Sequence, residues 1–367
     1  MVQELLSPER CEAFAAEVAE RQERTRVERA KRQVTRSLWP LAAAEARTPR
    51  LRFDQETVPS PSFTGVRVYS DYPLDELLPR IDWSPFFAAW ELAGRYPAIL
   101  DDPVVGTEAR KLHRDGLAML KQLLSGGRLR AHAALGFFPA EADKREIRVF
   151  ADPEKQTLLQ RLPMMRQQRQ AGERVCRSLA DFIAPAEAAV LDHLGVFTVT
   201  TGDGVAEIAA EYRAQHDDYS ALLVESLADR LAEALAERMH ERARQEVWAY
   251  ESPDSFENQD LIEERYRGIR PAPGYPACPD HRLKEAIFAL LDPTQNLGVQ
   301  LTENWAMSPA ATVSGFYFAH PDAQYFGVGK IGADQLASLA SAWEIDEAEA
   351  ARAVGHAWDA PIAPSLA

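Results

Sequence analysis

Hydrophobic and polar positions along this chain follow two spacings, one typical of strands and one typical of helices. Alternating apolar residues predict strands at 66–69, 131–138, 146–151 and 195–200, with a further strand or turn at 157–162. Apolar residues three and four apart predict helices at 74–81, 86–92, 105–124, 204–246, 282–291, 334–342 and 346–356. Because strands and helices do not alternate regularly, the pattern favours an α+β fold over a doubly wound parallel sheet.

The segment 314–331 predicts an antiparallel hairpin. Its two halves, 314–319 and 324–331, have the composition of strands, and His320-Pro-Asp322 between them is typical of a turn. The run Gly327-Val-Gly329-Lys-Ile-Gly332 matches G-x-G-x-x-G, but its glycines lie in or at the end of a strand that leads into helices. A dinucleotide site needs a strand before the first glycine, a helix opening at the loop and a further strand. We therefore interpret this run as a tight strand with small side chains.

The first 62 residues differ from the rest of the chain. A helix is expected over 8–36, where the apolar positions are sparse and arginines alternate with glutamates, as on a solvated helix. Residues 40–64 contain four prolines and little periodicity, which predicts an extended linker. We thus expect an N-terminal helix and linker over 1–62, followed by one compact domain over 63–367.

Composition and charge exclude several classes of protein. Hydrophobic residues make up 46% and charged residues 26%, which is typical of a folded domain, and the net charge of −15 disfavours nucleic acid as a partner. No apolar run is long enough for a membrane span, and the N-terminus does not resemble a secretory signal. The three cysteines form no C-x-x-C pair, so we expect no disulfide framework and a reducing, cytoplasmic setting. The eight histidines show no metal-ligand spacing, so no metal site is predicted.

Residues 266–281 form the least usual stretch of the sequence. Prolines and glycines fix the backbone over most of this ribbon, and Arg270, Tyr275 and His281 are set into it. A rigid loop with an arginine fork suits a small ligand with a carboxylate. A structural proline-rich crossing between helices explains the composition equally well, so the residues alone leave both interpretations open.

The run Gly-Ile-Arg-Pro-Ala-Pro-Gly-Tyr-Pro-Ala-Cys-Pro-Asp-His at 268–281 resembles a known ligand signature. It is similar to the S-adenosylmethionine-binding motif in the reactivation domain of cobalamin-dependent methionine synthase. Segments 81–87, 104–106, 215–219, 228–233, 301–303 and 313–322 resemble that family in the same order, so that the likeness spans about 63–360. It implies a curved α+β domain on a bent antiparallel sheet with flanking helices.

The resemblance also implies which residues bind the ligand. Arg270 matches the arginine that pairs with the methionyl carboxylate, and Asp82 matches an acid that takes the ammonium group. The other positions that match ligand-binding residues of the family are Glu233, Ala272, Gly274, Tyr275, Tyr325 and Phe326. No side chain is expected to act as acid, base or nucleophile, because the domain contributes by positioning the sulfonium methyl group.

The function implied is the reactivation step of a methyltransferase in methionine biosynthesis. The module binds S-adenosylmethionine and positions its methyl group for reductive methylation of cob(II)alamin, with an electron from a flavodoxin-like donor. Lys111-Leu-His113-Arg-Asp-Gly116 resembles the end of a D-x-H-x-x-G cobalamin signature but has Lys in place of Asp. The cobalamin is therefore expected on a partner cobalamin-binding domain, of which residues 1–62 would be the end, and the isolated module is not expected to complete turnover. Two alternatives stay open: a stand-alone S-adenosylmethionine sensor or interaction module, and a scaffold whose proline-rich loop only crosses the surface.

Overall fold

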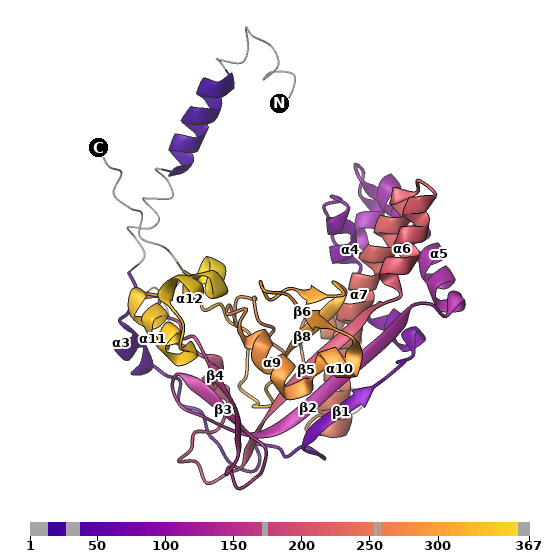
Figure 1. The fold of residues 1–367 in the computed structure, drawn as a ribbon. Helices are drawn as coiled ribbons and strands as arrows, with labels where there is room; N and C mark the ends of the chain where they lie inside the picture. The colour runs from indigo at the N-terminus through magenta and orange to yellow at the C-terminus, as the bar shows by residue number, and fades with distance from the viewer. Residues whose placement is uncertain (1–13, 27–36, 171–174, 253–255, 257, 359–367) are drawn as a thin grey trace.

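The computed structural model describes residues 14–26, 37–170, 175–252, 256 and 258–358, and its body is built on one bent antiparallel sheet (Figure 1). The strands run in the order β4-β3-β2-β5-β8, and β1 also pairs with β2. Their bounds are β1 Gly65–Tyr69, β2 Arg130–Ala142, β3 Glu146–Phe150, β4 Leu158–Pro163, β5 Asp192–Asp203 and β8 Thr312–Tyr317. The α+β prediction with an antiparallel sheet agrees with this architecture.

The long strand β2 carries the bend. One of its edges pairs with β5 along almost its whole length, whereas the other edge is divided between two partners. β1 takes 133–137 and β3 takes 140–142. Pro139, which cannot donate a ladder hydrogen bond, lies between these two stretches. The sheet therefore continues in two directions from one strand, and Figure 1 shows the resulting curved body with a helical arm at each end.

Helices cover both faces of the sheet. The helices are α3 Leu41–Glu45, α4 Ser84–Ala89, α5 Gly106–Gly126, α6 Val205–Ala214, α7 Asp218–Arg242, α8 Asn258–Ile262, α9 Leu283–Leu291, α10 Pro293–Leu297, α11 Ala333–Trp343 and α12 Glu347–Val354. Short 3-10 or π turns lie at Leu74–Arg80, Ala98–Asp101, Leu179–Phe182, Ala243–Val247 and Gly355–Ala357, and a small two-stranded sheet joins β6 Gln300–Leu301 to β7 Met307–Ser308. The side chains of Leu135 and Phe137 pack with α5 and α7, whereas Ala134 and Phe138 pack with α9. This alternation is the period-two pattern expected of a strand buried on both faces.

Two of the sequence predictions about secondary structure are wrong. Residues 324–331 are not a strand, because the edge of β8 that a hairpin partner would need is already occupied by the ribbon, through Ile269 and Pro271. The helix expected over 204–246 is two helices, α6 and α7. They are separated by His216, whose φ is +59°, and by Asp217, whose side chain caps α7 at the Ser220 N–H.

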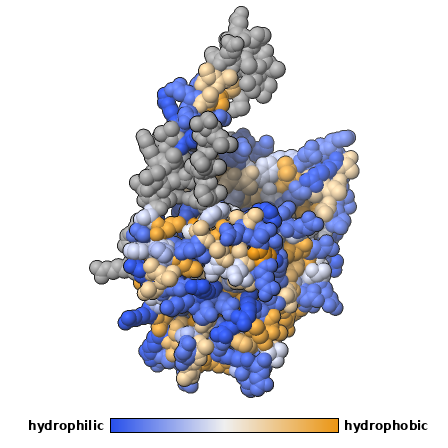
Figure 2. All heavy atoms as spheres, turned by 60° about the vertical axis from the view of Figure 1, so that its left-hand side comes forward, coloured by the Kyte–Doolittle hydropathy of each residue, from blue (hydrophilic) through white to orange (hydrophobic). Residues whose placement is uncertain are grey.

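Residues 39–47, in the segment before β1, pack on the arm that carries α11 and α12. Residues 14–26 are helical, and the rest of the helix expected over 8–36 lies outside the described residues. Residues 40–64 contain α3, which the sequence did not predict. The Trp39 N–H donates to the Gln168 carbonyl at 2.6 Å, and the Leu41 N–H donates to the Asp334 carboxylate at 2.5 Å. Figure 2 looks onto this arm, where polar side chains are interspersed with small apolar patches.

Candidate functional site

The ribbon 266–281 lies along the outer edge of β8. Ile269 and Phe318 exchange backbone hydrogen bonds of 3.1 and 3.0 Å, and the Phe316 N–H donates to the Pro271 carbonyl at 3.0 Å. Gly315 is needed here, because a Cβ at that position would lie 2.6 Å from the Pro271 oxygen. The edge of the sheet thus fixes the register and direction of the backbone that carries Arg270.

A tight turn follows Pro271. The Tyr275 N–H donates to the Ala272 carbonyl at 3.2 Å, and the Gly274 N–H donates to the Cys278 carbonyl at 2.8 Å. Gly274 has φ +97°, and a Cβ there would lie 2.4 Å from the His281 ring. Only glycine fits both the backbone angle and the space, and the turn presents Tyr275 outward with 57% of its surface exposed.

This turn and its surroundings enclose a pocket of about 530 Å³. The lining residues come from β5, α7, the segment after α8, the ribbon, β8 and the loop after β8: Phe197, Glu233, Glu264, Arg270, Pro271, Ala272, Tyr275, Pro276, Ala277, Val313, Tyr325 and Phe326. The volume falls within the range of small-molecule sites, roughly 300–1,000 Å³. Six candidate residues line this pocket: Glu233, Arg270, Ala272, Tyr275, Tyr325 and Phe326.

Arg270 is the central polar group of the pocket. Its Nη1 lies 2.6 Å from the Glu237 carboxylate and donates to the Tyr266 hydroxyl at 2.6 Å, while its backbone N–H donates to the Tyr325 hydroxyl at 2.9 Å. Burial is the largest single influence on the pKa of Arg270 and lowers it, but Glu237 and the neighbouring tyrosines and Glu233 together outweigh burial, so the net shift is upward. The guanidinium is therefore always charged, and its Nη1 is held by Glu237 and Tyr266.

Two acids line the pocket, Glu233 and Glu264. Glu233 comes from α7, and Glu264 lies just after α8 with a left-handed backbone, φ +55°. Partial burial raises the pKa of Glu264. Sequence reasoning missed Glu264, since nothing in its local pattern distinguishes it from the neighbouring surface acids. Together the two acids and Arg270 give the pocket lining one net negative charge.

Two of the candidate residues do not line this pocket. Gly274 supports it from within the turn, as described above. Asp82 precedes α4 on the arm that is formed by α4, α5, α6 and α7, where its Oδ1 accepts the Ser84 N–H at 2.9 Å. It is flanked by an apolar pocket between the 3-10 turn Leu74–Arg80 and α5, whose lining includes Ile81 and Trp83.

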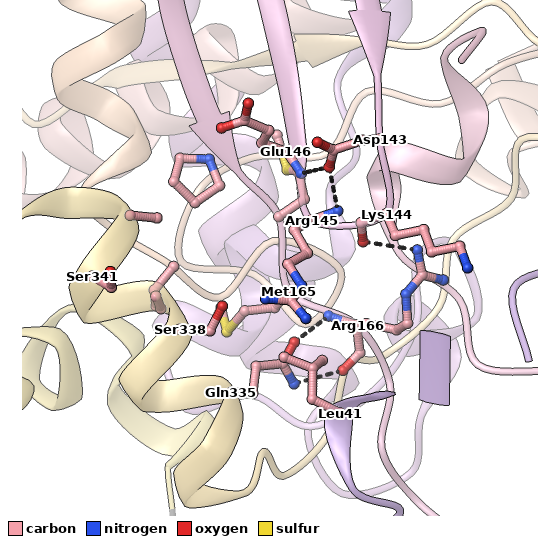
Figure 3. A pocket seen from close by; sticks show the side chains of 14 residues that line it. Leu41, Asp143, Lys144, Arg145, Glu146, Met165, Arg166, Gln335, Ser338 and Ser341 are labelled. Carbon is pink, nitrogen blue, oxygen red and sulfur yellow. Dashed lines mark hydrogen bonds between the residues drawn. The ribbon is translucent and has the colours of Figure 1, made fainter. Parts of the chain in front are cut away.

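A smaller pocket, of about 290 Å³, lies on the other arm between α3, α11 and the β3–β4 hairpin (Figure 3). Several of its polar side chains are paired: Asp143, Arg145, Glu146, Arg166 and Gln335. The Gln335 side chain bonds the Arg166 backbone N–H at 2.7 Å and the Arg166 carbonyl at 2.9 Å, and Arg145 pairs with Glu45 of α3 at 2.5 Å. In Figure 3 Asp143 accepts the backbone N–H groups at the start of β3. This arrangement fastens α3 to the body and engages these side chains in contacts within the protein.

The described part of the chain holds no helix long and apolar enough to cross a membrane. Within the same residues, no group of three or more His, Cys, Asp and Glu side chains could hold a metal ion. The site is thus a charged and aromatic pocket without a metal centre of its own among the described residues.

Comparison with known proteins covers the same elements. Residues 73–343 match the family model described as the activation domain of vitamin B12 dependent methionine synthase. The chain is also similar to the crystal structure of the MetH reactivation domain bound to AdoHcy, with 39% sequence identity and a TM-score of 0.83; the match covers 88% of this chain and 99% of that chain. The residues that match the family model include α7, the ribbon and β8, which build the Arg270 pocket.

Proposed function

Because this chain belongs to the family of vitamin B12 dependent methionine synthase activation domains, we propose that its Arg270 pocket binds S-adenosylmethionine. The similar crystal structure holds AdoHcy, which is the same molecule without the transferable methyl group. The observation that carries the proposal is the position of the Arg270 fork next to a proline-fixed turn, beside two acids and four aromatic rings.

The charges of the pocket complement those of S-adenosylmethionine. The ligand has one carboxylate, one ammonium and one sulfonium, so its net charge is positive, and the lining is net negative. Arg270 would pair with the carboxylate, and Glu233 and Glu264 would face the cationic groups. Tyr275, Tyr325 and Phe326 offer aromatic faces to the sulfonium and the base. Asp82 is proposed as a further partner of the ammonium group on the strength of the family motif alone.

The residues of this chain would bind and orient the ligand. A cobalamin carried by a partner domain would supply the metal that accepts the methyl group. This chain holds the amino-acid end of the donor through Arg270 and leaves the rim beside Tyr275 open, as its exposure shows. Holding the sulfonium in a fixed orientation lowers the entropic barrier to transfer without any acid or base.

Reductive methylation also needs an electron, for which we propose a flavodoxin-like donor. Such donors are acidic, and this chain has a net charge of −15, so docking needs a local basic surface. Helix α5 offers one, because Arg110, Lys111, Arg114 and Lys121 are all exposed along it. If this helix receives the donor, the rate of reduction falls as salt is raised and falls further when Lys111 and Lys121 are changed to glutamine.

The ligand proposal is tested by titration calorimetry with S-adenosylmethionine. Wild-type protein should release heat and saturate at one site, and Arg270→Ala should lose most of the affinity. Arg145→Ala is the matched control, since Arg145 is an exposed arginine of the other pocket and pairs with Glu45. Absence of binding by the wild-type chain would refute the proposal.

Methyl transfer is tested separately. The chain is mixed with the cobalamin-binding domain, a reductant and S-adenosylmethionine, and the methylcobalamin absorbance is followed together with S-adenosylhomocysteine release. Formation of both products in equal amounts supports a reactivation role. Binding without transfer would instead indicate an S-adenosylmethionine sensor.

A further inference from the structure

A buried row of charged side chains lies behind Arg270. Glu237 Oε2 is 2.6 Å from Arg270 Nη1, and Glu237 Oε1 is 3.7 Å from Arg244 Nη1. Arg244 Nε in turn donates to Glu251 at 2.7 Å. The Arg244 side chain is fully buried and that of Glu237 is 8% exposed. Positive and negative charges therefore alternate from the pocket wall into the core, and each neutralises its neighbour.

This row fixes one terminal nitrogen of the Arg270 guanidinium, Nη1. Nη1 is used twice, by Glu237 and by the Tyr266 hydroxyl. Among the described residues, Arg270 Nε and Nη2 have no hydrogen-bond partner. Those two donors form one edge of the planar fork, and that edge has the spacing that receives both oxygens of a carboxylate. The contacts at Nη1 thus decide which edge stays available to a ligand.

A contribution to the stability of the fold does not explain this row of buried charges. Buried ion pairs contribute little to stability, since the desolvation of each charge offsets the attraction between them. Several buried polar atoms around it also have no hydrogen-bond partner in the described part of the chain: Glu237 Oε1, His240 Nε2, Arg244 Nη2 and the hydroxyls of Tyr250 and Tyr317. Such a concentration of unpaired polar groups costs stability, which argues that the row is kept for the site it supports.

His240 keeps the row in place from the side. Arg244 Nη1 lies 2.8 Å from His240 Nδ1, which in a neutral imidazole can accept the guanidinium N–H. The His240 ring stacks on the Tyr317 ring with 4.9 Å between the centroids. Tyr266 meets the same ring edge to face at 5.1 Å. The partners of Arg270 are therefore locked by aromatic packing on α7 and β8.

We propose that Glu237 and Tyr266 are positioning residues for the carboxylate of the ligand. By holding Nη1, they turn the Nε–Nη2 edge of Arg270 toward the pocket, and Glu237 neutralises a cation that would otherwise oppose a positively charged ligand. This inference rests on the proposed binding of S-adenosylmethionine, and it concerns only how the amino-acid end of that ligand is recognised.

The test compares two ligands on four proteins by titration calorimetry. The ligands are S-adenosylmethionine and its decarboxylated form, which lacks only the carboxylate. The variants are Glu237→Gln and Tyr266→Phe. Glu225→Gln is the matched control, because Glu225 is another α7 acid in an ion pair, 2.8 Å from Arg213, at a partly exposed site. Tyr266→Phe keeps the ring and all charges, so it carries the test alone if Glu237→Gln does not fold.

Loss of orientation should raise the Kd for S-adenosylmethionine about tenfold in Glu237→Gln and about threefold in Tyr266→Phe. The Kd for the decarboxylated ligand should stay unchanged in Tyr266→Phe, which keeps all charges, and should rise in Glu237→Gln, because the Arg270 cation is then no longer neutralised. An equal loss for both ligands in Tyr266→Phe would mean that Tyr266 only supports the fold, and unchanged or tighter binding of S-adenosylmethionine by either variant would also overturn the inference. If the wild-type chain binds neither ligand, the proposed function fails first and this inference falls with it.

Discussion

Replacing Arg270 by lysine tests the fork geometry at the centre of the pocket. Arginine can hold Glu237 and Tyr266 with Nη1 and still offer Nε and Nη2 to a carboxylate. A lysine ammonium at the same place is a single point and cannot serve both sides with the same geometry. We therefore expect Arg270→Lys to lose about one charge-assisted hydrogen bond to the ligand, or about 1.5–3 kcal/mol. The Kd for S-adenosylmethionine should rise about 10- to 150-fold.

The same substitution should leave the fold nearly intact, because a cation still faces Glu237. Arg270→Met removes that cation, and the buried Glu237 carboxylate then lacks its nearest partner. Breaking a buried pair in this way costs about 3–5 kcal/mol, so Arg270→Met should be much less stable than Arg270→Lys in urea denaturation. Calorimetry and urea denaturation thus separate recognition from stability. The reasoning is refuted if Arg270→Lys binds as tightly as wild type, or if the two variants are equally stable.

Three further predictions concern other parts of the molecule. Asp181→Asn breaks the buried pair with Arg166, whose distance is 2.6 Å; the free energy of unfolding should fall by about 3–5 kcal/mol in urea while the Kd of the folded protein stays unchanged. Gly274→Ala forces a methyl group against an imidazole at φ +97°, so both stability and S-adenosylmethionine affinity should fall, and an unaffected affinity would contradict the role of the turn. Burial raises the pKa of the Asp192 carboxyl to about 6 and lowers the pKa of the His193 imidazole to about 4. Between pH 4 and 6, the buried carboxyl therefore makes stability fall as pH rises, whereas the buried imidazole makes stability rise. Denaturation at pH 4, 5 and 6 should show His193→Gln losing about 2 kcal/mol relative to wild type as pH rises, and parallel curves would refute this.

Much of the sheet could be predicted from the sequence, because its inner strands alternate side chains between two buried faces. The alternation of Leu135 and Phe137 with Ala134 and Phe138 is visible in the sequence and is confirmed in the structure. The false strand at 324–331 shows the limit of such patterns. Its composition suits a strand, but a strand needs a free edge, and which segment reaches the edge of β8 is decided by tertiary packing.

The site was only partly accessible from sequence. Arg270 and Tyr275 belong to a compositional anomaly that any close inspection of the chain would find. Glu237 is different, because in the run Ala-Leu-Ala-Glu it resembles an ordinary helix acid on a solvated face. Its burial depends on the face of α7 that meets β8, and its value as a partner depends on an arginine that lies 33 residues away in sequence. Local periodicity contains neither fact.

The pairing of the ribbon with the edge of β8 explains why its prolines and its arginine occur together. An edge strand exposes unpaired backbone groups and invites further pairing, and a proline blocks this because it has no N–H. On β8 the ribbon satisfies the edge through the Ile269 and Pro271 carbonyls, so the sheet ends there. The N–H of Arg270, the residue between them, is released from the ladder and donates to the Tyr325 hydroxyl. The residues that close the sheet therefore also set the backbone from which the guanidinium enters the pocket. A change that restored a regular strand at 269–271 would move Arg270 and Tyr325 apart, even with every side chain of the pocket retained.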